Sequence, residues 1–238
     1  FLGDHHATLT PYYQNIPMMG RLLGNWSGST CGVLVLLPLW HPVLVAEMLS
    51  TLASITSSRF VLQAGIGYGK KQFSALSADY ERRGERFEQA LNILKALWSG
   101  EIVTNELWEV ERAVISPTPS GPIPIWIGAT APVALKRVAR MGHSWLANPG
   151  LTKPDLLLKR DLYLAECEAQ GSCHASQMAV RRDVHVAGSR READSLKVDI
   201  ESSLYRGIDP EALVIGTIDQ VERYFICLLY TSDAADDP

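Results

Sequence analysis

Residues 31–37 read CGVLVLL, residues 42–55 read PVLVAEMLSTLASI, and residues 60–66 read FVLQAGI. The first and third stretches are continuous apolar runs of strand length, which is typical of strands that are covered on both faces. The middle stretch has apolar residues at helical spacing, namely Val45, Met48, Leu49, Leu52 and Ile55. The order strand, helix, strand predicts one unit of an α/β fold.

The same alternation continues along the chain. The next apolar helix face consists of Phe87, Ala90, Leu91, Leu94 and Leu97. The later predicted elements are a strand at 125–127, a helix with Leu135, Val138 and Ala139 turned inward, a strand at 144–147, a helix at 156–169 and a strand at 178–187. Residues 102–124 are rich in proline and show no clear period. Repeated units of this kind imply parallel strands joined by crossover helices.

Glycines and polar residues follow almost every predicted strand, at residues 3–6, 38–42, 65–69, 128–131 and 147–150. In an open doubly wound sheet the binding groups gather at one or two switch points, whereas in a barrel every strand delivers a loop to one carboxyl face. We therefore predict a TIM-type (β/α)8 barrel of class α/β. The segment Gly3-Asp4-His5-His6 is expected to end a strand at the mouth of this barrel.

The barrel is expected to be incomplete, with its first strand and helix upstream of residue 1 and its closing segment missing. The barrel domain is assigned to residues 1–226. Residues 227–238 read CLLYTSDAADDP and are predicted to be neither strand nor helix. We interpret them as a non-native tail, with a native acidic tail as the alternative.

Composition excludes several classes of protein. The 238 residues carry a formal net charge of −4 without a basic stripe, so nucleic acid is not an expected partner. No apolar segment is long enough to span a bilayer, and no cysteine has a second ligand at metal-binding spacing, so we expect neither a membrane span nor a metal site. The four scattered cysteines predict thiols in a reducing, cytoplasmic compartment.

Two glycine-containing segments are candidates for binding phosphate. Residues 65–70, GIGYGK, have the third glycine one place too early for a dinucleotide fingerprint, no P-loop spacing, and no helix expected directly after them. A weaker candidate is residues 128–132, GATAP, where backbone N–H groups at a helix start and a hydroxyl can hold an anion. On these residues alone, an ordinary helix N-cap is the favoured alternative.

An ordered set of segments resembles the luciferase-like monooxygenase family. The set is GDHH, VLLPLWHPVLVAE, SRFVLQAGIGY, ERRGERFEQALNILKALWSGE, PIPIWIGATAP and ALKRVARMGHSWL, and it extends over most of residues 1–225. The resemblance implies an eight-stranded barrel that binds reduced FMN, or the related deazaflavin coenzyme, at the carboxyl ends of the strands.

The resemblance also implies roles for particular residues. His5 matches the imidazole that lies beside the reactive part of the isoalloxazine ring, and Asp4 is expected to orient it, whereas His6 is expected to point away. Val33 and Leu34 are expected to lie along the ring, with a non-proline cis peptide bond near them. The alternative for Asp4 and His5 is a surface pair at a frayed chain end.

The remaining implied cofactor residues lie after two later strands. Gly65 and Tyr68 end the strand at the mouth, where relatives that use sugar phosphate carry an acid in place of Tyr68. An aromatic lid over the core is the alternative for Tyr68. Gly128, Ala129 and Thr130 match the segment that holds the cofactor phosphate, although many relatives have a second glycine in place of Ala129.

The predicted function is that of a flavin-dependent oxidoreductase, a monooxygenase that uses reduced FMN and oxygen on a small organic substrate. A deazaflavin-dependent hydride-transfer enzyme is the first alternative, and a non-catalytic flavin-binding barrel is the second. A flavin reductase and a second copy of the chain are candidate partners, although no sequence feature requires either.

Overall fold

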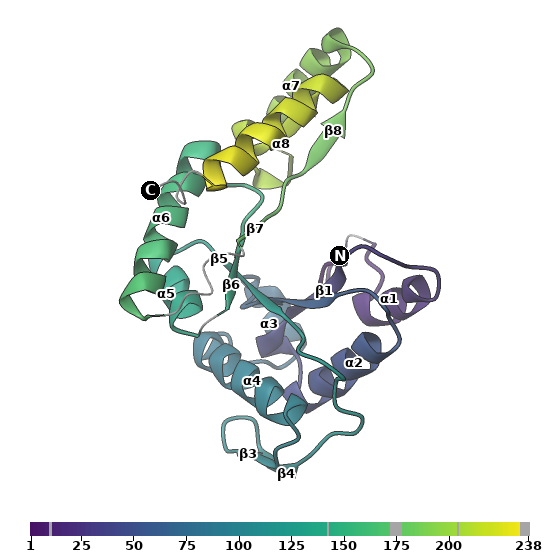
Figure 1. The fold of residues 1–238 in the computed structure, drawn as a ribbon, viewed down its shortest axis with the longest axis vertical. Coiled ribbons are helices and arrows are strands. Elements are labelled where there is room, and N and C mark those ends of the chain that lie inside the picture. Colours follow the sequence, from purple (N-terminus) through teal and green to yellow (C-terminus); the bar gives the residue numbers. More distant parts are fainter. Residues whose placement is uncertain (10, 142, 172–177, 204, 234–238) are drawn as a thin grey trace. The chain divides into compact units, whose positions relative to one another are not determined.

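The computed structural model describes residues 1–9, 11–141, 143–171, 178–203 and 205–233. The chain divides into two compact units, Phe1–Gly128 and Ala129–Pro238. Strands alternate with helices in both units, and the strand pairs that neighbour a helix crossover are parallel (Figure 1). This arrangement confirms the predicted α/β class.

The first unit is built on three parallel strands, β1 (Cys31–Leu36), β2 (Phe60–Gly65) and β5 (Ile125–Ala129). The β1–β2 register runs from Cys31 opposite Phe60 to Leu36 opposite Gly65, and Leu62 of β2 lies opposite Ile125. A Cβ atom at Gly32 would collide with the carbonyl oxygen of Val61, so the close approach of β1 to β2 requires glycine there.

The N-terminal segment pairs with the outer edge of β1. Leu2 forms a parallel bridge with Val33, its N–H donates to the Gly32 carbonyl at 3.1 Å, and its carbonyl accepts from Leu34 N–H at 2.8 Å. Residues 3–6 therefore follow a strand-like bridge, as the sequence predicted, and they lie toward the carboxyl end of β1.

Helices of the first unit cover the strands with amphipathic faces. They are α1 (Asn15–Leu23), α2 (Pro42–Ser54), α3 (Lys70–Ala75) and α4 (Arg83–Trp98), with a short 3-10 turn η1 (Leu37–Leu39) after β1. Helices α2 and α4 pack against each other (Figure 1). All five predicted inward residues of α4 are buried, but Ile55 is 55% exposed because α2 ends one residue before it.

One local prediction in the first unit is wrong, and one stretch without a prediction contains a hairpin. Helix α3 begins at Lys70, directly after Gly69, where no helix was expected. The stretch 102–124 contains an antiparallel hairpin of β3 (Val103–Asn105) and β4 (Val110–Ala113). Positive φ angles at Glu109 and Arg112 interrupt the alternation of side chains, so the hairpin has no regular period in the sequence.

The second unit begins with α5 (Pro132–Arg140), β6 (Ser144–Ala147) and α6 (Lys153–Ala169), as predicted. Leu135, Val138 and Ala139 of α5 are buried. The single strand expected at 178–187 is instead two short strands, β7 (Ala179–Val180) beside β6 and β8 (Val184–Val186) beside β9 (Val214–Gly216). The intervening Arg181, Arg182 and Asp183 make side-chain contacts and interrupt the pairing.

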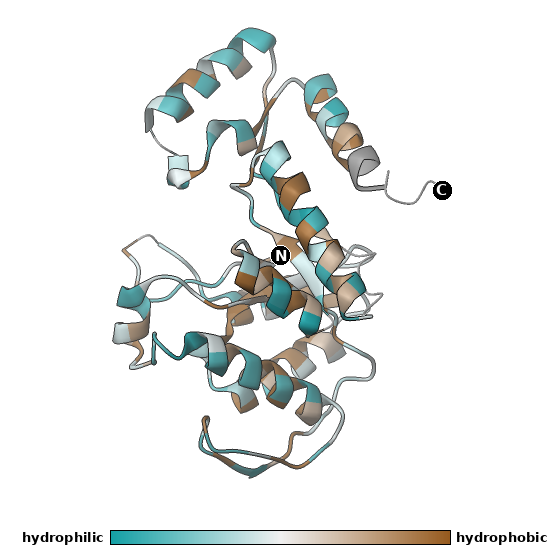
Figure 2. Ribbon diagram, turned by 90° about the vertical axis from the view of Figure 1, so that its left-hand side faces the viewer, coloured by the Kyte–Doolittle hydropathy of each residue, from teal (hydrophilic) through white to brown (hydrophobic). Residues whose placement is uncertain are grey.

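The remaining helices of the second unit are α7 (Arg190–Ser203) and α8 (Ile218–Asp233), with 3-10 turns η3 (Tyr205–Gly207) and η4 (Pro210–Ala212). Figure 2 shows helices with both hydrophilic and hydrophobic residues, as amphipathic helices have. Helix α8 continues to Asp233, so the prediction that residues from Cys227 onward are not helical is wrong for 227–233. No glycine or proline interrupts this stretch.

Candidate active site

Asp4 is a buried carboxylate at the carboxyl end of β1. Its residue is 2% exposed, and its Oδ2 accepts hydrogen bonds from Leu36 N–H at 2.7 Å and from the Trp40 indole Nε1–H at 2.9 Å. These bonds fix the N-terminal segment to the last residue of β1 and to the residue after η1. Burial of a carboxylate costs free energy unless hydrogen bonds offset the cost, and the two donors provide such bonds at Asp4.

The imidazole that contacts Asp4 belongs to His6. His6 Nε2 lies 3.0 Å from Asp4 Oδ1, and the His6 ring meets the Trp40 ring edge-on with centroids 5.3 Å apart. The sequence predicted that Asp4 orients His5. Because side chains alternate along an extended segment, residues 4 and 6 point to one side and residue 5 to the other.

His5 has a different environment from His6. Its ring packs edge-on against Tyr12 with centroids 4.6 Å apart, and its carbonyl accepts from the Gln14 side-chain amide at 3.4 Å. The His5 residue is half-buried. The alternative of a surface Asp-His pair at a frayed chain end does not describe Asp4, which is buried, hydrogen-bonded to Leu36 and Trp40, and in contact with His6.

Val33 and Leu34 lie in the middle of β1 with their backbone groups engaged. Leu34 N–H donates to Leu2, and its carbonyl accepts from the side-chain amide of Asn15, a buried residue at the start of α1. Among the described residues the cis peptide bond is Ser116–Pro117, so the non-proline cis bond expected near Val33 and Leu34 is wrong. In a regular strand the paired backbone needs no such bond.

Gly65 and Tyr68 follow the same edge of the sheet. A Cβ atom at Gly65 would lie 2.9 Å from a methyl group of Leu36, so glycine leaves room for the side chains of β1. The Tyr68 residue is 81% exposed. Its ring therefore does not form the lid over the core that was the alternative to a site role.

Gly128, Ala129 and Thr130 lead from β5 into α5. Ala129 is buried, and its carbonyl accepts from the indole N–H of Trp145 at 2.9 Å, whereas Thr130 is exposed. The N-cap residue of α5 is Ala131, and no side chain caps the helix. The segment 128–132 therefore does contain the helix N-cap, but the Thr130 hydroxyl does not cap the helix, and the exposed start of α5 keeps its capacity for an anion.

The residues that sequence reasoning missed are Trp40, Asn15 and Tyr12. Trp40 lies in the quoted strand end 38–42 and carries a donor that a buried carboxylate can use, which was the available signal. Asn15 and Tyr12 belong to a stretch without regular apolar period. Their contacts depend on the position of α1 beside β1, which a single sequence does not show.

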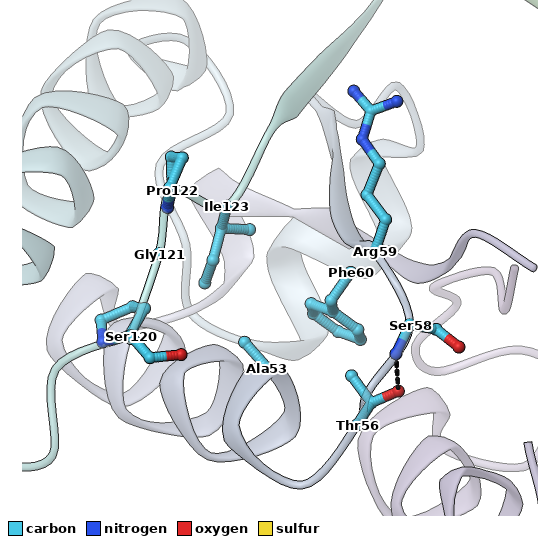
Figure 3. A pocket seen from close by; sticks show the side chains of 10 residues that line it. Ala53, Thr56, Ser58, Arg59, Phe60, Ser120, Gly121, Pro122 and Ile123 are labelled. Carbon is cyan, nitrogen blue, oxygen red and sulfur yellow. Dashed lines mark hydrogen bonds between the residues drawn. The ribbon is translucent and has the colours of Figure 1, made fainter. Parts of the chain in front are cut away.

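A pocket of about 200 Å³ lies at the opposite end of these strands. It is lined around the start of β2 and the segment before β5, by residues that include Ser58, Arg59, Phe60, Ser120 and Ile123 (Figure 3). In Figure 3 the Arg59 side chain extends away from Ser120. Because Asp4 lies at the carboxyl end of β1, this pocket is separate from the predicted site.

The described residues were also compared with the requirements of a metal site and of a membrane span. The described residues contain no cluster of three or more His, Cys, Asp or Glu that could hold a metal ion. None of the helices in the described ranges combines the length and the apolar character that a bilayer span needs. Cys31, Cys167 and Cys227 are thiols, and Cys173 lies outside the described residues.

Comparisons with known proteins agree with this fold. A family model described as luciferase-like monooxygenase matches residues 28–214. An F420-dependent glucose-6-phosphate dehydrogenase of Nakamurella multipartita is 28% identical over 163 residues, which cover 63% of this chain and 47% of the relative. An F420-dependent hydroxymycolic acid dehydrogenase of Mycobacterium tuberculosis is 27% identical over 208 residues, which cover 84% of this chain and 54% of the relative.

Among solved structures, the oxygenating constituent of 3,6-diketocamphane monooxygenase of Pseudomonas putida, in complex with FMN, superimposes with a TM-score of 0.78 at 16% identity. The match covers 97% of this chain and 78% of that chain. This likeness confirms the predicted TIM-type fold class. The chain spans about half the length of the curated relatives it matches. The family match covers well over half of the chain, and the chain belongs to the luciferase-like monooxygenase family.

Proposed function

We propose that the full-length protein carrying this sequence is an oxidoreductase that works with a flavin-type coenzyme bound at the carboxyl end of β1. The observation that carries this proposal is the buried Asp4 carboxylate, which holds one imidazole and lies next in sequence to a second. Imidazoles exchange protons near neutral pH, and both hydride transfer and oxygenation need a proton to move.

Each unit, taken by itself, has residues that suit one part of such a coenzyme. In the first unit, Asp4, His5 and His6 provide polar groups beside the apolar strand β1. In the second unit, the exposed Thr130 hydroxyl and the uncapped start of α5 suit a phosphate. The Ala129 side chain is buried, so its methyl group is not on the exposed side of this turn.

The coenzyme, when bound, supplies hydride transfer, and FMN in addition supplies reaction with oxygen. The chain supplies orientation and proton handling. Asp4 fixes the N-terminal segment to β1, and this positions His5 on the other side of the segment. The buried side chains around β1 exclude water from that end of the sheet.

We favour coenzyme F420 as the cofactor and hydride transfer as the reaction, because the two relatives with 27–28% identity are named as F420-dependent dehydrogenases. The second candidate is a monooxygenase that uses reduced FMN. It is supported by the order of the family segments in the sequence and by the fold shared with an FMN-bound oxygenase.

Anaerobic titration of the full-length protein with F420 and with FMN tests the cofactor. We expect saturable binding of F420 at micromolar or lower concentration, followed by reduction of bound F420 when an alcohol substrate panel is added. Binding of FMN alone, with oxygen consumption by the reduced complex, would support the second candidate. Failure to bind either coenzyme would overturn the proposal.

A non-catalytic flavin-binding barrel would give different results from an enzyme. Such a protein would bind a coenzyme without turnover on any substrate, and replacement of His5 by Asn would change nothing measurable. The enzyme proposal expects the His5→Asn variant to bind the coenzyme with wild-type affinity and to lose turnover.

A further inference from the structure

Asp4 and His6 form a buried pair at the carboxyl end of β1. Asp4 Oδ1 and His6 Nε2 are 3.0 Å apart, and the two side chains are 1% and 12% exposed. Both atoms are shielded from solvent, the contact is not aligned as a directed hydrogen bond, and neither atom has another hydrogen-bond partner in the described part of the chain. Two unprotonated lone pairs at this distance would repel each other, so the contact requires a proton.

The other contacts of Asp4 indicate where this proton resides. Oδ2 accepts from Leu36 N–H and from Trp40 Nε1–H, and two donors of this kind stabilise a carboxylate anion. Within the described ranges no lysine or arginine forms an ion pair with Asp4. The imidazole of His6, whose Nε2 lies 3.0 Å from Oδ1, is therefore the group that faces the second oxygen of the buried carboxylate.

We propose that Asp4 fixes His6 in the tautomer with the proton on Nε2, which leaves Nδ1 as the nitrogen of the His6 ring that can accept a proton, beside the separate imidazole of His5. This inference deepens the proposed function and rests on it. Asp4 is then a positioning residue for His6. The two imidazoles of the N-terminal segment contact different side chains, because His6 lies against Asp4 and His5 lies against Tyr12.

The pair has a chemical use in the favoured reaction. When an alcohol is oxidised by hydride transfer, the C–H hydride and its two electrons go to the coenzyme and the O–H proton goes to a base. An imidazole nitrogen with an available lone pair can take this proton, and a carboxylate on the opposite ring nitrogen stabilises the imidazolium that forms. In the proposed tautomer, His6 would offer Nδ1 for this role, with Asp4 on the opposite ring nitrogen.

Tautomers of histidine can be read directly by NMR of the protein labelled with ¹⁵N in its histidines. In the full-length protein without coenzyme, at a pH where His6 is neutral, we expect a pyrrole-type shift for Nε2 and a pyridine-type shift for Nδ1. The His6→Asn variant assigns these signals by their loss. A pyrrole-type Nδ1 in the wild-type protein would overturn the inference.

The Asp4→Asn variant provides the sharper test. Leu36 N–H and Trp40 Nε1–H still need an acceptor, so the amide oxygen takes the place of Oδ2 and the amide NH₂ group faces His6. His6 Nε2 must then accept, and we expect the proton to move to Nδ1. The matched control His5→Asn should leave the His6 tautomer unchanged. An identical tautomer in wild type and Asp4→Asn contradicts the role of Asp4.

Turnover separates this inference from the proposed function. With F420 bound, we expect His6→Asn to lower turnover by about a hundredfold while coenzyme affinity stays within about twofold. If the tautomers are as expected but no coenzyme binds, the proposed function is wrong and the inference about Asp4 and His6 stands. Coenzyme-dependent turnover that His6→Asn leaves unchanged would mean the reverse.

Discussion

The two ends of the parallel strands in the first unit differ in what they hold. The amino end has a pocket of about 200 Å³, lined by hydroxyl groups, apolar side chains and the exposed Arg59 (Figure 3). The carboxyl end has a buried carboxylate in contact with Leu36, Trp40 and His6. A pocket alone is therefore a weaker sign of an active site than a buried charged group. Burial of a charge costs free energy, so a buried carboxylate with specific hydrogen-bond partners indicates a candidate functional site.

The largest expected effect is on stability at the carboxyl end. Asp4→Ala leaves the Leu36 N–H and the Trp40 indole N–H buried without their acceptor, and we expect a loss of about 3 kcal/mol in the free energy of unfolding. Ser58→Ala at the amino end is the control, with a change within about 0.5 kcal/mol, because the Ser58 hydroxyl is buried without a partner. Urea denaturation of both variants measures this difference, and equal losses would contradict it.

The next effect is on turnover. His5→Asn should lower turnover by about a hundredfold, as expected for loss of a proton-transferring imidazole. Ser120→Val narrows the pocket at the amino end and should leave both turnover and coenzyme affinity unchanged. Steady-state rates at saturating coenzyme measure both variants. A pocket variant that loses activity while His5→Asn retains it would move the active site to the other end of the sheet.

A smaller effect is expected at Trp40. The Trp40→Phe variant keeps an aromatic ring near His6 but removes the donor to Asp4 Oδ2, which should cost about 1.5 kcal/mol. Trp26→Phe is a matched control, since Trp26 is 46% exposed and its indole N–H donates to the Ser29 carbonyl at 2.9 Å. Thermal unfolding should leave the control within about 0.5 kcal/mol of wild type. Similar losses of unfolding free energy in both variants would contradict a stabilising role for the hydrogen bond from Trp40 to Asp4.

The smallest effect concerns thiol reactivity. Burial raises the pKa of the Cys31 thiol above its ordinary value, although a hydrogen bond with Thr56 acts against this. The reactive thiolate is therefore scarce at Cys31 at neutral pH and becomes commoner as the pH rises. Alkylation mapped by mass spectrometry should be at least about tenfold slower at Cys31 than at the exposed Cys227. Equal rates would show that the amino end of β1 opens readily.

The regular elements could be predicted from the sequence because each carries a repeated local signal. The continuous apolar runs of β1 and β2 and the helical spacing of α4 are such signals, and all are present as expected. Short elements carry too few residues for a period. Strands β3 and β8 have three residues each, and the sequence did not indicate their bounds.

The strand-end position of the candidate segment was predicted, whereas the contact of Asp4 with His6 was not. The segment Gly3-Asp4-His5-His6 was assigned to a strand end by its polar residues, and it lies there. That Asp4 contacts His6 depends on the side-chain alternation of an extended segment and on the position of Trp40 after η1. Contacts between residues distant in the chain leave no periodic trace, and this is why Trp40 and Asn15 were missed.

The most direct measurement of the central claim is a coenzyme titration of the full-length protein followed by NMR. Binding of F420 at the carboxyl end predicts progressive shifts of the ¹⁵N signals of His5 and His6, with the backbone amides of Ser58 and Gly121 in the amino-end pocket unchanged. Shifts confined to Ser58 and Gly121, with both imidazoles unaffected at saturation, would contradict the account.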